Sequence, residues 1–201
     1  MEAKDVLTVS ISIASLLWSA YTFFVVRFDR GRLKMTQPTL VSLTRDLPKG
    51  WAKIFLRTCL FTTGSKGRVV ENMFLRVCCN NTTPRTFDFW GHTESGKLTL
   101  GSGLFVGPTG IGSDHHFNPP EGSADFLFAS GAYVIDVYAT VAGRRKSDKL
   151  MRLTFTVDED QAAELTQLPT TELRLYWNAV ATAITATSSR TGPRCFRKGK
   201  F

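Results

Sequence analysis

Between Asp5 and Arg27 the chain carries 21 consecutive uncharged residues, of which 15 are apolar. As an α-helix with a rise of about 1.5 Å per residue, this stretch is about 31 Å long, close to the hydrocarbon thickness of a bilayer. A cleaved signal peptide needs a basic N-terminal region, whereas residues 1–5 contain two acids and one lysine. The sequence therefore predicts a single-pass transmembrane helix at residues 6–26, in contact with membrane lipid, after a short extracytoplasmic N-terminus at residues 1–5.

Basic residues gather on one flank of this stretch. Only Lys4 precedes it, whereas a basic juxtamembrane linker, residues 27–36, follows it. Because lysine and arginine near a membrane helix tend to stay in the cytoplasm, we expect the N-terminus outside and the rest of the chain inside. The four cysteines in 201 residues fit a reducing compartment and are too few for a disulfide-dense secreted scaffold. The linker residues predicted to contact lipid or another polyanion are Arg27, Arg30, Arg32 and Lys34.

The hydroxyl side chains of the apolar stretch recur at helical spacing, at Thr8, Ser12, Ser15, Ser19 and Thr22. Small residues and hydroxyls bring helices together in lipid, so Ser12, Ser15 and Ser19 are candidates for helix association and a homo-oligomer. Serine and threonine hydroxyls also bond to the backbone of their own helix. The sequence leaves both interpretations open.

Residues 37–157 have a hydrophobic period of two, which is the period of half-buried strands. Ile54, Leu56 and Leu60, for example, alternate with Lys53 and Arg57. Similar faces follow at Met73, Leu75, Val77 and Cys79, at Tyr133, Ile135, Val137 and Ala139, and at Met151, Leu153, Phe155 and Val157. Short strands separated by turn residues predict a mainly β domain, arranged as a two-sheet antiparallel sandwich.

The run Gly131-Ala132-Tyr133-Val134-Ile135 resembles the Gly-x-Tyr-x-Cys run of immunoglobulin-type domains. That resemblance implies that the Tyr133 hydroxyl bonds to backbone a few residues upstream. Ile135 stands at the cysteine position, so the resemblance implies an immunoglobulin-like sandwich without the disulfide between its sheets.

Residues 101–122 are rich in glycine and proline, and they predict one short strand, residues 104–106, within a long ordered loop. His115 and His116 lie in this loop. Zinc takes three or four ligands, and neighbouring residues on an extended chain point apart, so a metal site would need His92 or Asp88 from another strand. Residues 91–97 have the GxxxxGK spacing of a P-loop, but Leu98 stands where a magnesium-binding hydroxyl is required. No cofactor is predicted, and His115, His116 and His92 remain the candidate metal ligands.

Residues 158–187 predict a short helix to about Gln167, followed by an extension whose structure is ambiguous. Its threonines and β-branched residues favour a hairpin turning near Asn178 over a helix. Residues 188–201 have the composition of a disordered basic tail. Its cations could contact anionic lipid or remain solvated, and nucleic acid is disfavoured because the tail has no aromatic stacking platform. The tail residues proposed for lipid or polyanion contact are Arg194, Arg197, Lys198 and Lys200.

Several segments together resemble a group of small uncharacterised bacterial single-pass membrane proteins. They are the charge-poor N-terminal stretch, RGRLKMTQPT, KIFLRTCLF, GSGLFVGPTG, DHHF and YVIDVYATVAGRRK. The resemblance covers residues 6–157 and implies a bacterial inner membrane, an N-terminal anchor and a β-rich domain. It implies no activity.

From these features we predict that the protein is a membrane-anchored, non-enzymatic β module that interacts with another protein at the inner face of the membrane. Residues 107–122 or an exposed sheet edge would contact the unknown protein partner. The alternative is a ligand or metal sensor that uses His115 and His116. A hydrolase is the third hypothesis, and no nucleophile or metalloprotease motif in the sequence supports it.

Overall fold

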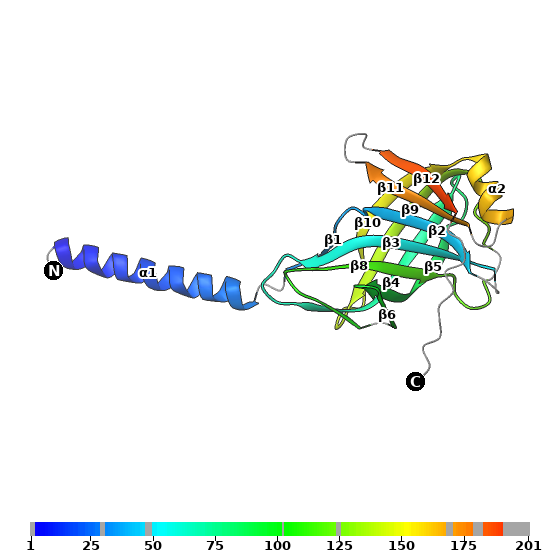
Figure 1. Ribbon diagram of the computed structural model, residues 1–201. Helices are drawn as coiled ribbons and strands as arrows, with labels where there is room; N and C mark the ends of the chain where they lie inside the picture. Colours follow the sequence, from blue (N-terminus) through cyan, green and yellow to red (C-terminus); the bar gives the residue numbers. More distant parts are fainter. Residues whose placement is uncertain are drawn as a thin grey trace.

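A computed structural model describes residues 3–28, 31–46, 50–101, 103–123, 126–167, 171–178 and 183–190. Helix α1 (Ala3–Phe28) projects away from a β-rich domain (Figure 1). Its apolar side chains pack against nothing else in the described chain, and Lys4–Arg27 is long and apolar enough to cross a membrane. The predicted N-terminal apolar helix is therefore confirmed.

The described residues form twelve strands and a second short helix. The strands are β1 (Leu33–Met35), β2 (Leu40–Asp46), β3 (Trp51–Thr62), β4 (Arg68–Cys79), β5 (Arg85–Glu94), β6 (Lys97–Leu100), β7 (Leu104–Val106), β8 (Ile111–Asn118), β9 (Gly131–Val141), β10 (Asp148–Val157), β11 (Thr171–Asn178) and β12 (Ala183–Arg190). Helix α2 (Glu159–Gln167) lies between β10 and β11. A mainly β fold with an N-terminal helix, one further short helix and a C-terminal hairpin is thus confirmed.

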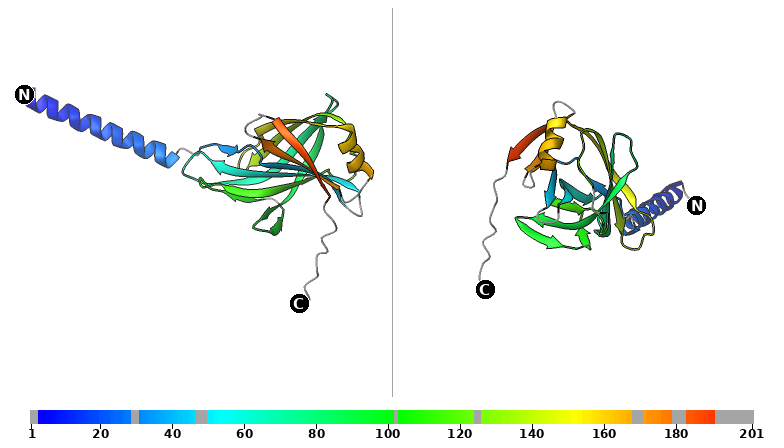
Figure 2. Two further views of the ribbon diagram at one scale, coloured as in Figure 1. Left: turned by 45° about the horizontal axis from the view of Figure 1, so that its top comes forward. Right: turned by 90° about the vertical axis from the view of Figure 1, so that its right-hand side faces the viewer.

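The strands pair antiparallel in one sheet with the order β10-β9-β4-β5-β8-β3-β2-β11-β12, while β1 joins β3, β6 joins β5 and β7 joins β4. Figure 2 shows this sheet curling on itself. The two-sheet immunoglobulin-like arrangement is not confirmed, because β5 and β8 pair with each other and connect β4 to β3 without a break. The tyrosine hydrogen bond is confirmed, since the Tyr133 hydroxyl donates to the Ala129 carbonyl at 2.8 Å.

The concave side of the curled sheet holds the core. Along β3, alternate residues from Ala52 to Leu60 are buried, as the period of two requires. Leu165 of α2 is also buried, and that helix begins with a reciprocal cap in which Asp158 and Gln161 accept from each other's backbone N–H. The largest fully buried side chains are Tyr133, Phe87, Phe117, Phe128, Leu43, Ile54, Leu56, Leu60, Met73, Leu75, Ile135 and Leu153.

The structure corrects the prediction of a long loop at residues 101–122. The short strand at residues 104–106 exists as β7, but residues 111–118 form β8, between β3 and β5. Glycine, serine, aspartate and asparagine are poor strand formers, so local composition hid a strand that its two neighbours hold in place.

Near the C-terminus, the structure contains both the short helix and the hairpin that the sequence favours. The hairpin is formed by β11 and β12, and α2 ends at Gln167. Strand β12 continues to Arg190, so the basic tail cannot begin at residue 188 as predicted. Residues 191–201 lie outside the described residues.

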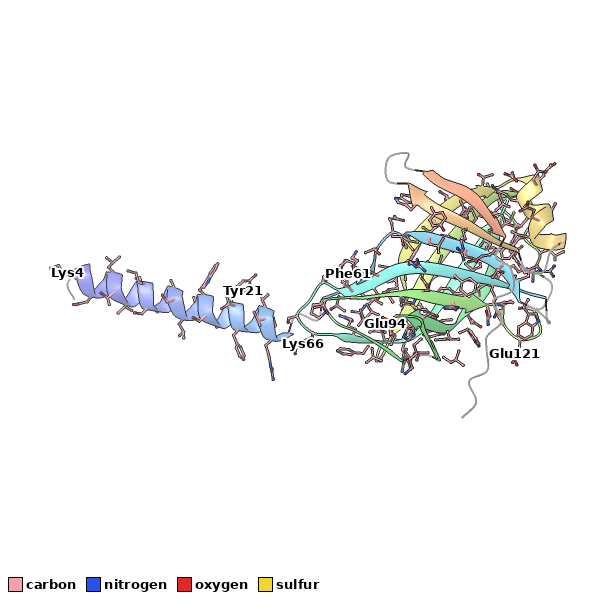
Figure 3. The ribbon with its side chains drawn as sticks, in the orientation of Figure 1. Lys4, Tyr21, Phe61, Lys66, Glu94 and Glu121 are labelled. Carbon is pink, nitrogen blue, oxygen red and sulfur yellow. The ribbon has the colours of Figure 1, made fainter. Side chains whose placement is uncertain are left out.

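The chain that leaves α1 is fastened to the loop between β3 and β4. The Arg32 N–H donates to the Thr63 hydroxyl at 2.8 Å, and the Thr63 N–H donates to the Arg32 carbonyl at 3.0 Å. Arg68 also donates to the Gly31 carbonyl. We call this end of the β domain the near end, and the opposite end, with α2 and Glu121, the far end (Figures 1 and 3).

Gly31 is required at this junction. Its φ is +59°, and a Cβ there would lie 2.0 Å from the backbone nitrogen of Gly64. We expect Gly31→Ala to lower the free energy of unfolding in detergent by about 2 kcal/mol, from backbone strain and displacement of the loop. Gly96→Ala is the matched control, since Gly96 has a φ of +82° with open space around its Cβ position, and it should cost about 1 kcal/mol. Equal costs would show that the Gly31–Gly64 contact is unimportant.

Candidate binding surface

The outward faces of β11, β2, β3, β8 and β5 form a polar trough. Cross-strand pairing aligns one row of outward residues, Tyr176, Leu40, Arg57, Asp114 and Thr93. It aligns a second row beside the first, Arg174, Ser42, Phe55, His116 and Gly91. We call the surface made by these two rows and Glu172 the outer trough.

Two hollows open along the outer trough. The larger, about 590 Å³, has walls from the segment between β1 and β2 and from the β5–β6 turn, including Thr36 and Ser95. The smaller, about 290 Å³, extends toward β11. Both are lined by Arg57, Thr93 and Asp114, so they adjoin.

An ion pair stands where the hollows meet. Arg57 donates to Asp114 twice, from Nε to Oδ1 at 2.6 Å and from Nη2 to Oδ2 at 2.9 Å. These hydrogen bonds hold the pKa of Asp114 below its ordinary value and raise the pKa of Arg57. A two-point contact fixes the plane of the guanidinium, so a ligand would meet a neutral pair of defined orientation.

A second polar group lies at the β11 side of the smaller hollow. The Ser42 hydroxyl donates to Glu172 Oε1 at 2.6 Å, and Arg174 Nη2 donates to Glu172 Oε2 at 2.7 Å. Arg174 Nε is buried and has no hydrogen-bond partner in the described part of the chain. A buried donor without an acceptor is costly, so this nitrogen is a place where a ligand oxygen would be stabilised.

His116 belongs to the outer trough. Its Nε2 lies 2.8 Å from the Thr93 hydroxyl, and the Phe55 ring packs edge-on at 4.5 Å between ring centroids. Burial lowers the pKa of His116, so the ring is neutral near pH 7 and can donate or accept.

His115 points the opposite way, into the core. It is fully buried, it is the cross-strand partner of His92, and its Nε2 lies 3.3 Å from the Ser113 hydroxyl. The Nδ1 atoms of His115 and His92 are both buried without a partner in the described chain. Burial lowers the pKa of His115 to about 4.

The candidate metal ligands therefore do not lie together on one face of the sheet. His115 and His116 lie on opposite faces of β8, as neighbours in any strand do, and the sheet brings His92 beside His115 instead. Among the described residues there is no group of three or more histidine, cysteine or acidic side chains that could hold a metal ion.

The structure describes only some of the other residues predicted to contact helices or lipid. Ser12 and Ser15 donate to the carbonyls four residues earlier in α1, as the backbone-bonding interpretation expects; these bonds do not test helix association. Arg27, Arg32 and Lys34 are exposed. Ser19 is exposed on the same helix. Arg30, Arg194, Arg197, Lys198 and Lys200 lie outside the described residues.

Sequence reasoning missed Arg57, Asp114, Glu172 and Arg174. Alternation indicates which residues of a strand face outward, but it carries no information on which strands are neighbours. Arg57 and Asp114 are 57 positions apart in the chain, and only the pairing of β3 with β8 places them opposite each other.

No protein-family model matches this sequence, and no curated protein is significantly similar to it. The class that the fold defines is a curled antiparallel β domain on an N-terminal apolar helix. The bacterial resemblance remains a hypothesis, and any function has to be argued from the surface itself.

Proposed function

We propose that this protein is a membrane-anchored, non-enzymatic interaction module that binds an extended segment of a protein partner in the outer trough. The observation that carries the proposal is the pair of adjoining hollows that share Arg57, Thr93 and Asp114. Helix α1 would hold the module at the inner face of the membrane, which is bacterial if the resemblance holds.

The width of the outer trough matches the length of a short extended peptide. Five strands spaced about 4.8 Å apart span about 19 Å, which is the length of about six residues of extended chain. Such a segment presents alternating N–H and C=O groups. The hydroxyls and the fixed ion pair of the trough offer both acceptors and donors, and Arg174 Nε would gain the acceptor it lacks.

Protein binding suits this surface better than the sensor alternative. A metal sensor would have to use the buried His92–His115 pair, which supplies two nitrogens where zinc needs at least three ligands. A third ligand would have to come from outside the described residues.

A photo-crosslinking amino acid at Tyr176 tests the proposal. Tyr176 lines the smaller hollow and is 45% exposed, whereas Tyr138, the control position, lies on β9 outside the trough. In membranes of cells that produce the full chain, we expect a discrete adduct from position 176 and none from position 138.

A second substitution tests whether the partner that forms the adduct also contacts Arg174. Arg174→Leu should weaken the adduct from position 176 about tenfold, because a charge-assisted hydrogen bond to the ligand is lost. Equal adducts from both positions, or an adduct that Arg174→Leu leaves unchanged, would overturn the proposal. An adduct containing only this protein would identify a homo-oligomer and no separate partner.

A further inference from the structure

Exposed cations gather at the near end of the β domain. Arg32 and Lys34 follow α1 directly, and Lys66 lies in the β3–β4 loop that holds Arg32. Figure 3 shows Lys66 and Phe61 at the end of the domain that faces α1.

The β9–β10 turn adds three more cations to the same end. The Ala142 N–H donates to the Val69 carbonyl at 2.9 Å, so the turn lies beside the start of β4. The cations of the turn, all exposed, are Arg144, Arg145 and Lys146. Nearby Asp148 is paired with Arg144 at 3.0 Å, which leaves Arg145 and Lys146 to set the charge of the turn.

An exposed apolar pair lies among these cations. Phe105 is 62% exposed, and its cross-strand partner Val69 is 40% exposed. The Phe105 ring lies over Gly67, where a Cβ would come within 2.2 Å of it. The ring is therefore directed toward the β3–β4 loop, which also holds Arg32. An aromatic side chain beside lysine and arginine is the combination that favours a membrane interface.

The far end of the domain carries exposed acids. Helix α2 lies there and begins with Glu159 and Asp160, and Glu121 lies at the same end (Figures 1 and 3). Arg85 is also exposed at this end, where it lines a hollow with Pro120 and Gly122, so the far end carries charges of both signs, whereas the cations described above gather at the near end.

The chain between anchor and domain is short. Three residues lie between Arg27 and Gly31, so the four steps from one Cα atom to the other span at most about 14 Å. If α1 crosses the bilayer, the near end cannot leave the membrane surface. Attraction between exposed cations and anionic headgroups acts over about 8 Å at physiological salt, and a linker of at most about 14 Å lets the near end lie within that distance of the headgroups.

We propose that the near end is a docking surface for the anionic cytoplasmic leaflet. Arg32, Lys34, Lys66, Arg145 and Lys146 contact phospholipid headgroups, and Phe105 enters the interface between headgroups and acyl chains. This proposal rests on the membrane anchoring of α1 and adds a fixed orientation, in which the far end faces the cytoplasm.

The test uses a fluorescent amino acid placed singly at three positions of the full chain, reconstituted in vesicles whose lipids carry a quencher. Position 21 reports on the anchor, position 105 on the near end and position 121 on the far end. In vesicles of phosphatidylcholine with phosphatidylglycerol, we expect quenching at positions 21 and 105 and little at 121. Vesicles of phosphatidylcholine alone should reduce the quenching at 105 and leave that at 21 unchanged.

Charge substitutions complete the design. Arg145→Glu with Lys146→Glu should reduce the quenching at position 105 at least twofold, whereas Arg85→Glu, an exposed cation at the start of β5, should not change it. Quenching at 21 without quenching at 105, or equal quenching at 105 and 121, would overturn the docking surface and leave the anchor intact. Absence of quenching at position 21 would overturn the anchoring itself.

Discussion

Replacing Phe117 with alanine should lower the free energy of unfolding by about 4 kcal/mol. Phe117 is fully buried in β8, where it pairs with Ile54 of β3 and Phe89 of β5. Its ring centroid lies 5.8 Å from that of Phe89 in an edge-to-face contact. Because β8 joins the two halves of the sheet, backbone on both sides restrains the site, and the cavity cannot close by moving one strand.

Denaturant unfolding of the full chain in detergent, followed by circular dichroism, measures this loss. Phe105→Ala is the matched control, because the same ring is removed from a site that is 62% exposed. We expect it to change the free energy of unfolding by less than about 0.5 kcal/mol. Comparable losses in the two variants would mean that the core does not lie on the concave side of the sheet.

Acidification should destabilise the domain through His115. Its pKa is about 4 in the folded state against 6.5 for the free side chain, so the unfolded chain binds the proton more tightly. The stabilising contribution of the neutral ring is complete above the unfolded pKa and is lost as the pH falls toward the folded pKa. The free energy of unfolding should therefore fall by about 3 kcal/mol between pH 7 and pH 4.

His115→Leu should remove most of this pH dependence, since leucine fills a similar volume without a titrating group. His116→Leu should retain most of it, because His116 lies on the outer face and is less buried. The pKa of Asp136 is lowered to about 2 by hydrogen bonds from Arg152 and Lys149, so its contribution is lost in a separate window below about pH 4. A pH profile that His115→Leu leaves unchanged would contradict the assignment.

Much of the fold could be read from local patterns. The uncharged stretch after Asp5 indicates a helix because length and polarity alone decide whether a segment can cross a bilayer. Alternation from Ile54 to Leu60 indicates a strand with one buried face for an equally local reason. The acids after Val157 and the proline at residue 169 likewise mark the ends of α2.

The predictions failed where a residue's role depends on its neighbours in space. Strand β8 has a weak strand composition and was predicted to be a loop, although its two pairings make it central to the sheet. His115 and His116 are candidate metal ligands although adjacent residues of an extended chain point apart, and which other side chain lies beside each of them depends on strand pairing.

The sequence by itself determined an apolar anchor-length helix, a basic flank after it and a β-rich domain with a short helix, and it favoured a C-terminal hairpin over a helix. These features depend on composition and period over a few consecutive residues. The tertiary structure alone decided that the strands form one curled sheet, that Arg57 meets Asp114, and that the cations of the β3–β4 and β9–β10 turns lie at one end. Strand order and register set those contacts, and they arise from pairings between segments tens of residues apart, which no local pattern encodes.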